Sequence, residues 1–83
     1  MDKKTIFLAS HLCGLRSKKE MEQFLEGILS PNELESISTR IKIIKMLKDK
    51  TPQRLIAEKL GVGIATVTRG AKELKTQTFP SIK

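Results

Sequence analysis

The residues best suited to bind a charged partner lie near the end of the chain, in the segment GVGIATVTRGAKEL, residues 61–74. Steps of about 100° per residue sort the helix expected over residues 64–75 into three sectors. An apolar sector suited to a core holds Ile64, Val67, Ala71 and Leu74. A polar and basic sector, suited to a polyanion, holds Ala65, Thr68, Lys72 and Lys75. The third sector combines both charges with bare backbone, and it holds Thr66, Arg69, Gly70 and Glu73.

Two residues, Gly70 and Arg40, indicate a surface that a flat ligand could use. Glycine in a helix interior costs about 1 kcal/mol relative to alanine, and its bare backbone suits either a ligand or a closely packed helix. Arg40 lies among apolar positions, between Ile44 and Leu47. An arginine there either extends its head to water or covers an aromatic ligand, a contact worth about 0.5 to 2 kcal/mol. If a ligand lies at Gly70, a leucine there would block it without unfolding the protein.

The elements that position these residues are helices throughout, and we expect an all-α fold class. Ser30, Pro31 and Glu33 form a capping box with proline at the first helical position. The helix that follows carries an apolar stripe formed by Leu34, Ile37, Ile41, Ile44 and Leu47. Ile43 and Met46 lie off this stripe, so we expect this helix to meet protein on more than one side.

A second pair of helices follows this long one. Thr51 as cap and Pro52 at the first position predict a short helix through Leu60, and Gly61 ends it in the left-handed conformation. With the helix over 64–75 it forms a helix-turn-helix, the unit whose second helix enters the major groove of DNA. The residues expected to fill the angle between its helices are Ile56, Ala57, Leu60, Val62 and Val67. An ordinary helical hairpin is the alternative.

Charge favours the DNA-binding interpretation. Residues 1–37 carry 5 basic and 6 acidic side chains, a net charge of −1, whereas residues 38–83 carry 11 basic and 3 acidic ones, a net charge of +8. The positive field therefore belongs to the half that holds the helix-turn-helix, where phosphates would bind.

The first third of the chain predicts two helices whose apolar faces must pack against other protein. Residues 3–16 are apolar around much of a helix, and a second helix places on one face Met21, Phe24, Leu25 and Ile28. A chain of 83 residues buries a modest share of its surface, so we expect it to dimerise. We expect a single domain, 1–83, with dimerisation and central helices over 1–50, the helix-turn-helix over 51–75 and a flexible tail over 76–83.

Several function classes find no support in the sequence. His11 is alone on an apolar helix, where we expect a packed residue, and no Cys and His cluster suits a metal, so we expect neither an enzyme nor a cofactor. Cys13, the single cysteine, excludes an internal disulfide and is expected to fill apolar space in a reducing cytoplasm. Without a convincing signal peptide or the ~20 apolar residues of a spanning helix, we expect a cytoplasmic protein with no membrane partner.

Two segments, LSPNELESISTRIKI and PQRLIAEKLGVGIATVTRGAKELK, resemble the central helix and the helix-turn-helix of the tryptophan repressor family. The resemblance implies an intertwined homodimer that binds free L-tryptophan as corepressor and then represses transcription at a palindromic DNA operator. Tryptophan would act as a wedge that sets the angle of the reading helix, so that ligand binding and DNA binding assist each other equally.

Residue by residue, the resemblance implies a corepressor pocket and a DNA-reading surface. Arg40 and Arg69 would lie on the two faces of the indole, with Arg69 also binding the carboxylate. The remaining pocket positions are Thr66, Gly70, Glu73 and, from the other subunit, Leu29 and Ser30. The positions for DNA are Gln53, Arg54, Gly63, Ile64, Ala65, Thr68, Lys72 and Lys75. Among them, Arg54 is expected to contact a guanine directly.

Three features depart from the family pattern. Glu73 stands where the family commonly has a serine near the ligand's amino group, and its carboxylate could bind the ammonium or repel the ligand's own carboxylate. Gly27 replaces a bulky aliphatic residue beside the pocket. The family's additional C-terminal helix has no counterpart, since eight residues follow Lys75 and Pro80 interrupts them.

Other functions remain open at this stage. A ligand-independent DNA-binding regulator of the same superfamily would use Arg40 and Gly70 for structure only. The helix-turn-helix could also be the DNA-binding module of a transposase, although 83 residues leave no room for its catalytic domain. A protein-interaction module is a further option, which a shallow dependence of DNA affinity on salt would favour.

Overall fold

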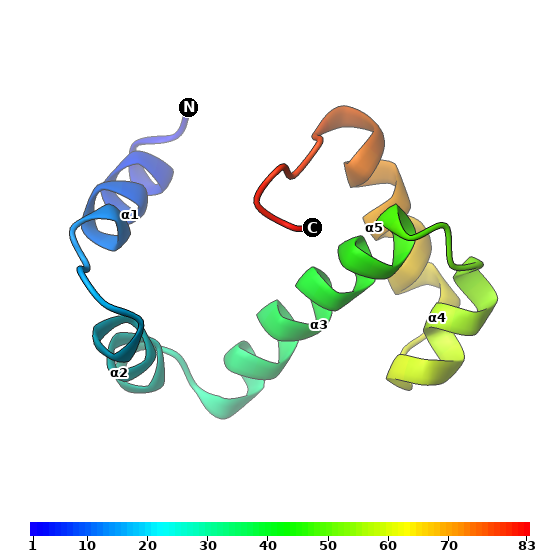
Figure 1. Cartoon of the computed structure of the whole chain (residues 1–83), viewed down its shortest axis with the longest axis horizontal. Coiled ribbons are helices and arrows are strands. Elements are labelled where there is room, and N and C mark those ends of the chain that lie inside the picture. The colour runs from blue at the N-terminus through cyan, green and yellow to red at the C-terminus, as the bar shows by residue number, and fades with distance from the viewer. The chain divides into compact units, whose positions relative to one another are not determined.

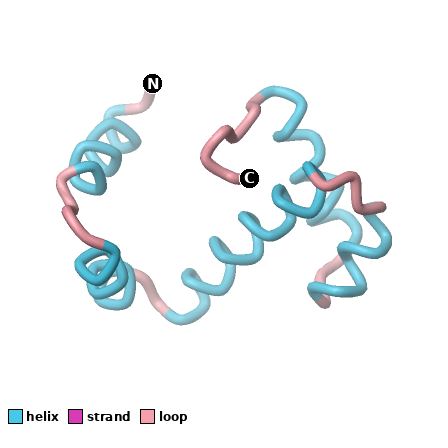
Figure 2. Tube along the Cα trace, in the orientation of Figure 1, coloured by secondary structure: helices cyan, strands magenta, loops and turns pink.

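The computed structural model describes all 83 residues, which form five α-helices joined by loops, with no β-strand (Figures 1 and 2). The helices are α1 (Lys3–Cys13), α2 (Lys18–Ile28), α3 (Pro31–Lys48), α4 (Gln53–Leu60) and α5 (Ile64–Thr76). The prediction of an all-α fold is confirmed. The chain divides into two compact units, residues 1–34 and residues 35–83. None of the helices combines the length and the apolar character needed to span a membrane.

The first unit contains α1, α2 and the first turn of α3. Its helices begin at capping residues, since the side chain of Asp2 accepts from the Lys4 amide at 3.1 Å and that of Ser17 from the Glu20 amide at 3.0 Å. Neither α1 nor α2 contains a fully buried residue. The large apolar side chains that α1 leaves exposed are Ile6, Phe7 and Leu8.

His11 and Cys13 also lie on exposed positions of α1. The His11 ring packs against Phe24 of α2, with the ring centroids 4.8 Å apart, so it joins the two helices without entering a core. The expectation that Cys13 fills apolar space is wrong for this chain, because its side chain is free and exposed. The reason is that α1 and α2 alone build no apolar interior for it to fill.

The capping box at the start of α3 is confirmed. The Ser30 amide donates to Oε1 of Glu33 at 2.8 Å, and the Glu33 amide donates to Oγ of Ser30 at 3.2 Å. Two hydrogen bonds with Ser30 lower the pKa of the Glu33 carboxyl below its ordinary value. The bond with the Ser30 backbone has the larger effect and the bond with its side chain the smaller. Two reciprocal bonds therefore fix where α3 begins.

The core of the second unit takes one residue from each of its three helices. Ile43 of α3, Ile56 of α4 and Val67 of α5 are at most 2% exposed. Partly buried side chains packed against them are Met46, Leu47, Ala57, Leu60 and Val62. The residues predicted to fill the angle of the helix-turn-helix are thus confirmed, and they fix α4 against α5.

The apolar stripe predicted for α3 is only partly buried. Ile37 and Ile41 are 42% and 46% exposed, whereas Ile43, which lies off the stripe, is 2% exposed. The helix-turn-helix packs on the Ile43 side of α3 and leaves much of the predicted stripe open. The expectation that α3 meets protein on more than one side concerns this open face, and it stays a prediction.

The turns around α4 follow the sequence prediction at one end and differ at the other. Gly61 adopts the predicted left-handed conformation, with φ 65° and ψ 37°. The predicted start at Thr51 and Pro52 is wrong by one residue. Pro52 is itself the cap, with ψ 141°, and α4 begins at Gln53 without a side-chain cap. The reason is that the Pro52 carbonyl accepts the first helical hydrogen bond, from the Ile56 amide.

The segment after α5 returns to the end of α3. Nζ of Lys48 donates to the carbonyl oxygens of Phe79 and Ile82, the latter at 2.7 Å. The Ile82 amide also donates to the Phe79 carbonyl at 3.0 Å, which closes a turn. Phe79 and Ile82 are half-buried. The tail predicted over 76–83 begins one residue later, because Thr76 still belongs to α5. Residues 77–83, called the tail from here on, have no helical pattern, as the sequence indicates, yet they dock on α3.

Candidate ligand pocket and nucleic-acid interface

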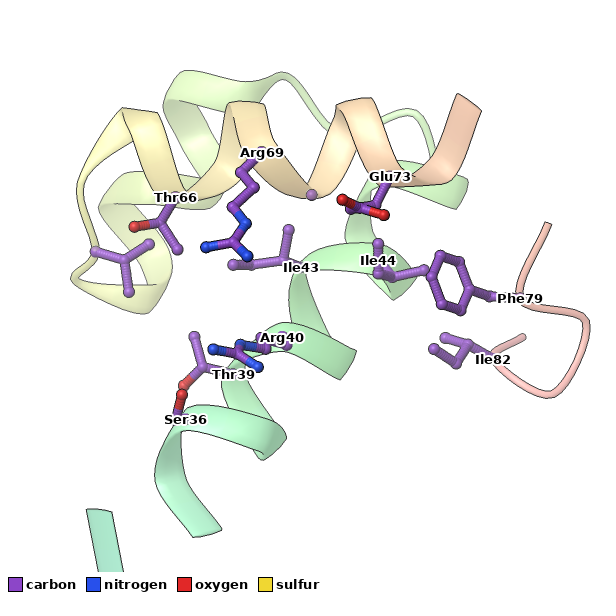
Figure 3. A pocket seen from close by; sticks show the side chains of 12 residues that line it. Ser36, Thr39, Arg40, Ile43, Ile44, Thr66, Arg69, Glu73, Phe79 and Ile82 are labelled. Carbon is purple, nitrogen blue, oxygen red and sulfur yellow. The ribbon is translucent and has the colours of Figure 1, made fainter. Parts of the chain in front are cut away.

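A cavity of about 750 Å³ lies within the second unit, between α3, α5 and the tail (Figure 3). From α3 it is lined by Ser36, Thr39, Arg40, Ile43 and Ile44. From α5 it is lined by Thr66, Arg69, Gly70 and Glu73. The remaining lining residues are Val62, Phe79 and Ile82. Its volume falls in the usual range for small-molecule pockets, about 300 to 1,000 Å³.

The two arginines predicted for the pocket approach it from different helices. In Figure 3 the Arg69 side chain extends from α5 toward α3, and Arg40 lies on the α3 side. Both side chains are exposed, so their guanidinium groups are hydrated in the free chain. Two such planar cations can cover the faces of an aromatic ring or bind a carboxylate in bidentate geometry. Arg40 is exposed and lines the cavity; its contact with an aromatic ligand stays a prediction.

Close packing of α5 on α3 explains why position 70 is a glycine. A Cβ atom at this position would lie 2.8 Å from Cγ2 of Ile43 and 3.7 Å from Cδ1 of Leu47. The glycine therefore lets α5 pack closely on α3, the alternative that the sequence had left open, and its backbone also lines the cavity. A leucine at position 70 would meet the buried Ile43, so Ile43 or α5 would have to shift; the expectation that this variant stays folded remains a prediction.

Glu73 supplies the one carboxylate that lines the cavity. It lies one helical turn beyond Arg69 on α5 (Figure 3). The lining thus offers one carboxylate as well as two guanidinium groups. Such an arrangement suits a ligand that carries both an ammonium and a carboxylate, as a free amino acid does.

Four residues that line the cavity were not predicted from the sequence. Ser36 and Thr39 contribute hydroxyl groups one turn before Arg40 and beside it, and the tail contributes Phe79 and Ile82. Spacing from Arg40 on α3 could have found the first pair, whereas the tail has no periodicity from which its position follows. Leu29 and Ser30 belong to the first unit, and their assignment to the pocket of another subunit stays a prediction.

The polar face of the helix-turn-helix forms a separate surface. Oγ1 of Thr68 lies 2.9 Å from Oε1 of Gln53 and 3.0 Å from the Ile64 carbonyl, so its single hydroxyl proton can satisfy either acceptor. The contact joins the start of α4 to the second turn of α5. Ile64, expected on the core side, is instead 52% exposed because it opens α5 ahead of the core residue Val67.

The other residues predicted to bind DNA are also accessible. Exposed side chains or backbone are presented by Arg54, Gly63, Ala65, Lys72 and Lys75. The Thr68 contact joins the first turn of α4 to the second turn of α5, and the two lysines lie further along α5. A surface with polar groups at a helix start and cations behind it suits base edges flanked by phosphates.

A helix-turn-helix that packs on a longer helix is an arrangement typical of DNA-binding proteins. The model of the Trp repressor protein family matches residues 4–80, and the chain belongs to this family. The predicted resemblance is therefore confirmed. Members of this family are DNA-binding regulators and not enzymes, in agreement with the expectation from the sequence.

Curated relatives give the same result. The chain is 43% identical over 61 residues to the Trp operon repressor homolog of Vibrio campbellii, covering 72% of this chain and 61% of the relative. The Vibrio parahaemolyticus homolog is also 43% identical over 61 residues, covering 72% and 59%. The Photobacterium profundum homolog is 44% identical over 55 residues, covering 65% and 53%. The chain thus spans less than two thirds of the length of these relatives. No solved structure gives a significant match.

Proposed function

We propose that this chain is a cytoplasmic repressor of transcription that binds L-tryptophan and then, as a homodimer, a palindromic DNA operator. Membership of the Trp repressor family supports a DNA-binding regulator. The observation that carries the ligand assignment is the cavity that Arg40 and Arg69 line from two helices, directly behind the reading helix α5.

Each group of a bound tryptophan has a matching group in the cavity. The indole would lie between the guanidinium groups of Arg40 and Arg69, and its carboxylate would pair with Arg69. Glu73 would accept a hydrogen bond from the ammonium group, and Thr66 would line the wall. Attraction outweighs repulsion at Glu73 in this orientation, because the ligand's carboxylate lies at the arginines and its ammonium at the glutamate.

Homodimerisation is proposed from the apolar surface that each unit leaves uncovered. Phe7 of α1 is 73% exposed, and Ile41 of α3 is 46% exposed. Burial of such side chains is worth about 25 cal/mol for each Å² of apolar surface removed from water. A second copy of the chain would cover them and bring Leu29 and Ser30 to the ammonium side of its partner's pocket.

Ligand and DNA are coupled through the position of α5. One side of this helix lines the cavity, and another side carries the residues proposed to read DNA. A ligand held between α3 and α5 would set the angle of α5, so that the two reading helices of a dimer fit successive major grooves about 34 Å apart. The coupling free energy is the same in both directions.

A ligand-independent DNA-binding regulator is the competing function, and family membership leaves it to be tested. A palindromic DNA selected by the protein from a random pool is titrated with the protein, with and without L-tryptophan. We expect tryptophan to strengthen DNA binding by at least about fivefold, as coupling free energies of 1 to 3 kcal/mol imply. Equal affinities would support the ligand-independent function instead.

Two arginine variants separate the ligand from the DNA contact. Arg69→Leu should abolish the effect of tryptophan and leave the basal affinity for DNA, whereas Arg54→Ala should lower DNA affinity and keep tryptophan binding. Arg16→Ala, an exposed arginine of the first unit, is the matched control and should change neither.

A further inference from the structure

The hydrogen bonds that hold the tail on α3 come from a single lysine. The Lys48 ammonium donates to two carbonyl oxygens of the tail, those of Phe79 and Ile82, which lie 31 and 34 residues later in the chain. Lys48 is half-buried, so these bonds are partly shielded from water. The Ile82 amide donates to the same Phe79 carbonyl, so the turn and the lysine share one acceptor. The three hydrogen bonds together fix the backbone on either side of Pro80.

Phe79 has a backbone conformation that residues with a bulky side chain rarely adopt. Its φ is 46°, in the left-handed region that a bulky residue rarely adopts. Such a conformation persists where the surroundings determine it, and these positions cluster at functional sites. Here the determinant is visible, because Lys48 binds the carbonyl of Phe79 itself.

The Phe79 side chain lines the cavity. In Figure 3 the ring lies at the end of the cavity, with Ile44 of α3 directed toward it and Ile82 near it. Phe79 is the one aromatic residue among those that line the cavity. Guanidinium groups favour an aromatic face over an aliphatic side chain, and an aromatic ring in the lining adds a second, independent contribution to this preference.

We propose that Phe79 is a selectivity residue of the amino acid pocket and that Lys48 is the residue that positions it. The inference rests on the proposed function and goes beyond it. An aromatic wall prefers the edge or the offset face of another ring, at centroid distances of about 4.5 to 7 Å. Phe79 therefore favours an indole over an aliphatic side chain of similar hydrophobicity, and the tail becomes part of the ligand site.

The test is a ratio of affinities measured by titration calorimetry. L-Tryptophan and L-leucine are each titrated into the unchanged chain and into Phe79→Leu, which keeps an apolar side chain of comparable volume and removes the ring. We expect the ratio of the leucine to the tryptophan dissociation constant to fall roughly three- to tenfold, as the loss of an aromatic pair implies.

Lys48→Met tests the positioning role. Methionine keeps the apolar stem and removes the ammonium group, so the tail loses both bonds to Lys48 while the core is retained. The same fall in the ratio is expected. Lys45→Met, an exposed lysine three residues earlier on α3, and Thr78→Ala, an exposed tail residue outside the lining, are matched controls and should leave the ratio unchanged. Circular dichroism confirms that each variant is folded.

The outcomes separate this inference from the proposed function. If the unchanged chain binds tryptophan and both Phe79→Leu and Lys48→Met keep its selectivity ratio, the role of the tail is overturned and the proposed function stands. A fall for Phe79→Leu but none for Lys48→Met overturns the positioning role of Lys48 alone. If the unchanged chain does not bind tryptophan, the proposed function fails and this inference fails with it.

Discussion

Gly70 of α5 and Ile43 of α3 are packed so closely that a Cβ atom on the glycine would lie 2.8 Å from Cγ2 of the isoleucine. Ile43 is buried at the centre of the second unit. The contact therefore fixes the separation of the two helices at the point where the cavity begins. A ligand that changes the angle of α5 would move the helix about this contact.

We predict that Gly70→Ala destabilises the chain although alanine is the better helix former. The gain in helix propensity is about 1 kcal/mol, and overpacking a core costs about 1 to 3 kcal/mol. The expected net loss is about 1 kcal/mol in the free energy of unfolding. Chemical denaturation at one fixed protein concentration measures it, since dimerisation would otherwise shift the midpoint.

A second substitution identifies the clash. Ile43→Leu removes the Cγ2 methyl on the β carbon, whereas Ile43→Val keeps it. In a double-mutant cycle, Gly70→Ala should be less harmful when combined with Ile43→Leu and equally harmful when combined with Ile43→Val. Equal costs in both combinations would show that a different contact sets the separation of α3 and α5.

The capping box predicts a pH dependence of stability. Hydrogen bonds from Ser30 lower the pKa of Glu33 below its ordinary value of 4.5. A lowered pKa in the folded state means that the stabilisation is fully present above the unfolded value and is lost as the pH falls through the folded value. The difference in unfolding free energy between the chain and Glu33→Gln should therefore shrink as the pH is lowered below 4.5. Glu35→Gln, outside the capping box, is the control; the same pH-dependent difference there would argue against the box.

Arg54 and Lys75 should have different effects on DNA binding. Arg54→Ala is expected to cost about 1 to 3 kcal/mol and to relax base preference at one position of the operator, because a bidentate contact to guanine is lost. Lys75→Ala should weaken binding on every sequence and lower the salt slope by about one. Fluorescence anisotropy on the selected palindrome and on single-base variants measures both. A uniform loss for Arg54→Ala across all bases would contradict a base contact.

The dimer should depend on the apolar face of α1. Phe7→Ser removes a side chain that is 73% exposed in the chain by itself and that a partner would cover. Full burial of such a side chain contributes about 1.5 to 3 kcal/mol, and a symmetric dimer contains two copies. Sedimentation equilibrium should show a dissociation constant raised at least tenfold. Lys19→Ser, at an exposed polar position of α2, is the control. An unchanged constant for Phe7→Ser would place the interface elsewhere.

Local rules predicted most of the helix boundaries. Capping and turn chemistry, which act over a few residues, explain the start of α3 at Ser30 and Glu33 and the end of α4 at Gly61. The core of the helix-turn-helix followed from spacing. Once the turn is fixed, it determines which residues of the two helices face each other, and these include Ile56 and Val67. Chemistry that is local in the sequence is therefore predicted well here.

Features that depend on distant contacts were predicted less well. Ile43 is the α3 residue at the centre of the core, although it lies off the predicted stripe, because the position of the helix-turn-helix decides which face of α3 is covered. The tail shows the same limit, since its place depends on Lys48, 31 residues before Phe79, and no periodic pattern encodes such a bond. For this reason the sequence did not predict that Phe79 and Ile82 of the tail line the cavity.

Tryptophan binding by the chain in the absence of DNA is the most direct measurement. The chain contains no Trp or Tyr, so the fluorescence of added L-tryptophan reports on the ligand alone. We expect a saturable change with one site per chain, lost in Arg69→Leu and retained in Arg54→Ala. No saturable change up to millimolar tryptophan, or one that survives in Arg69→Leu, would contradict the claim that the arginine-lined cavity is the corepressor site.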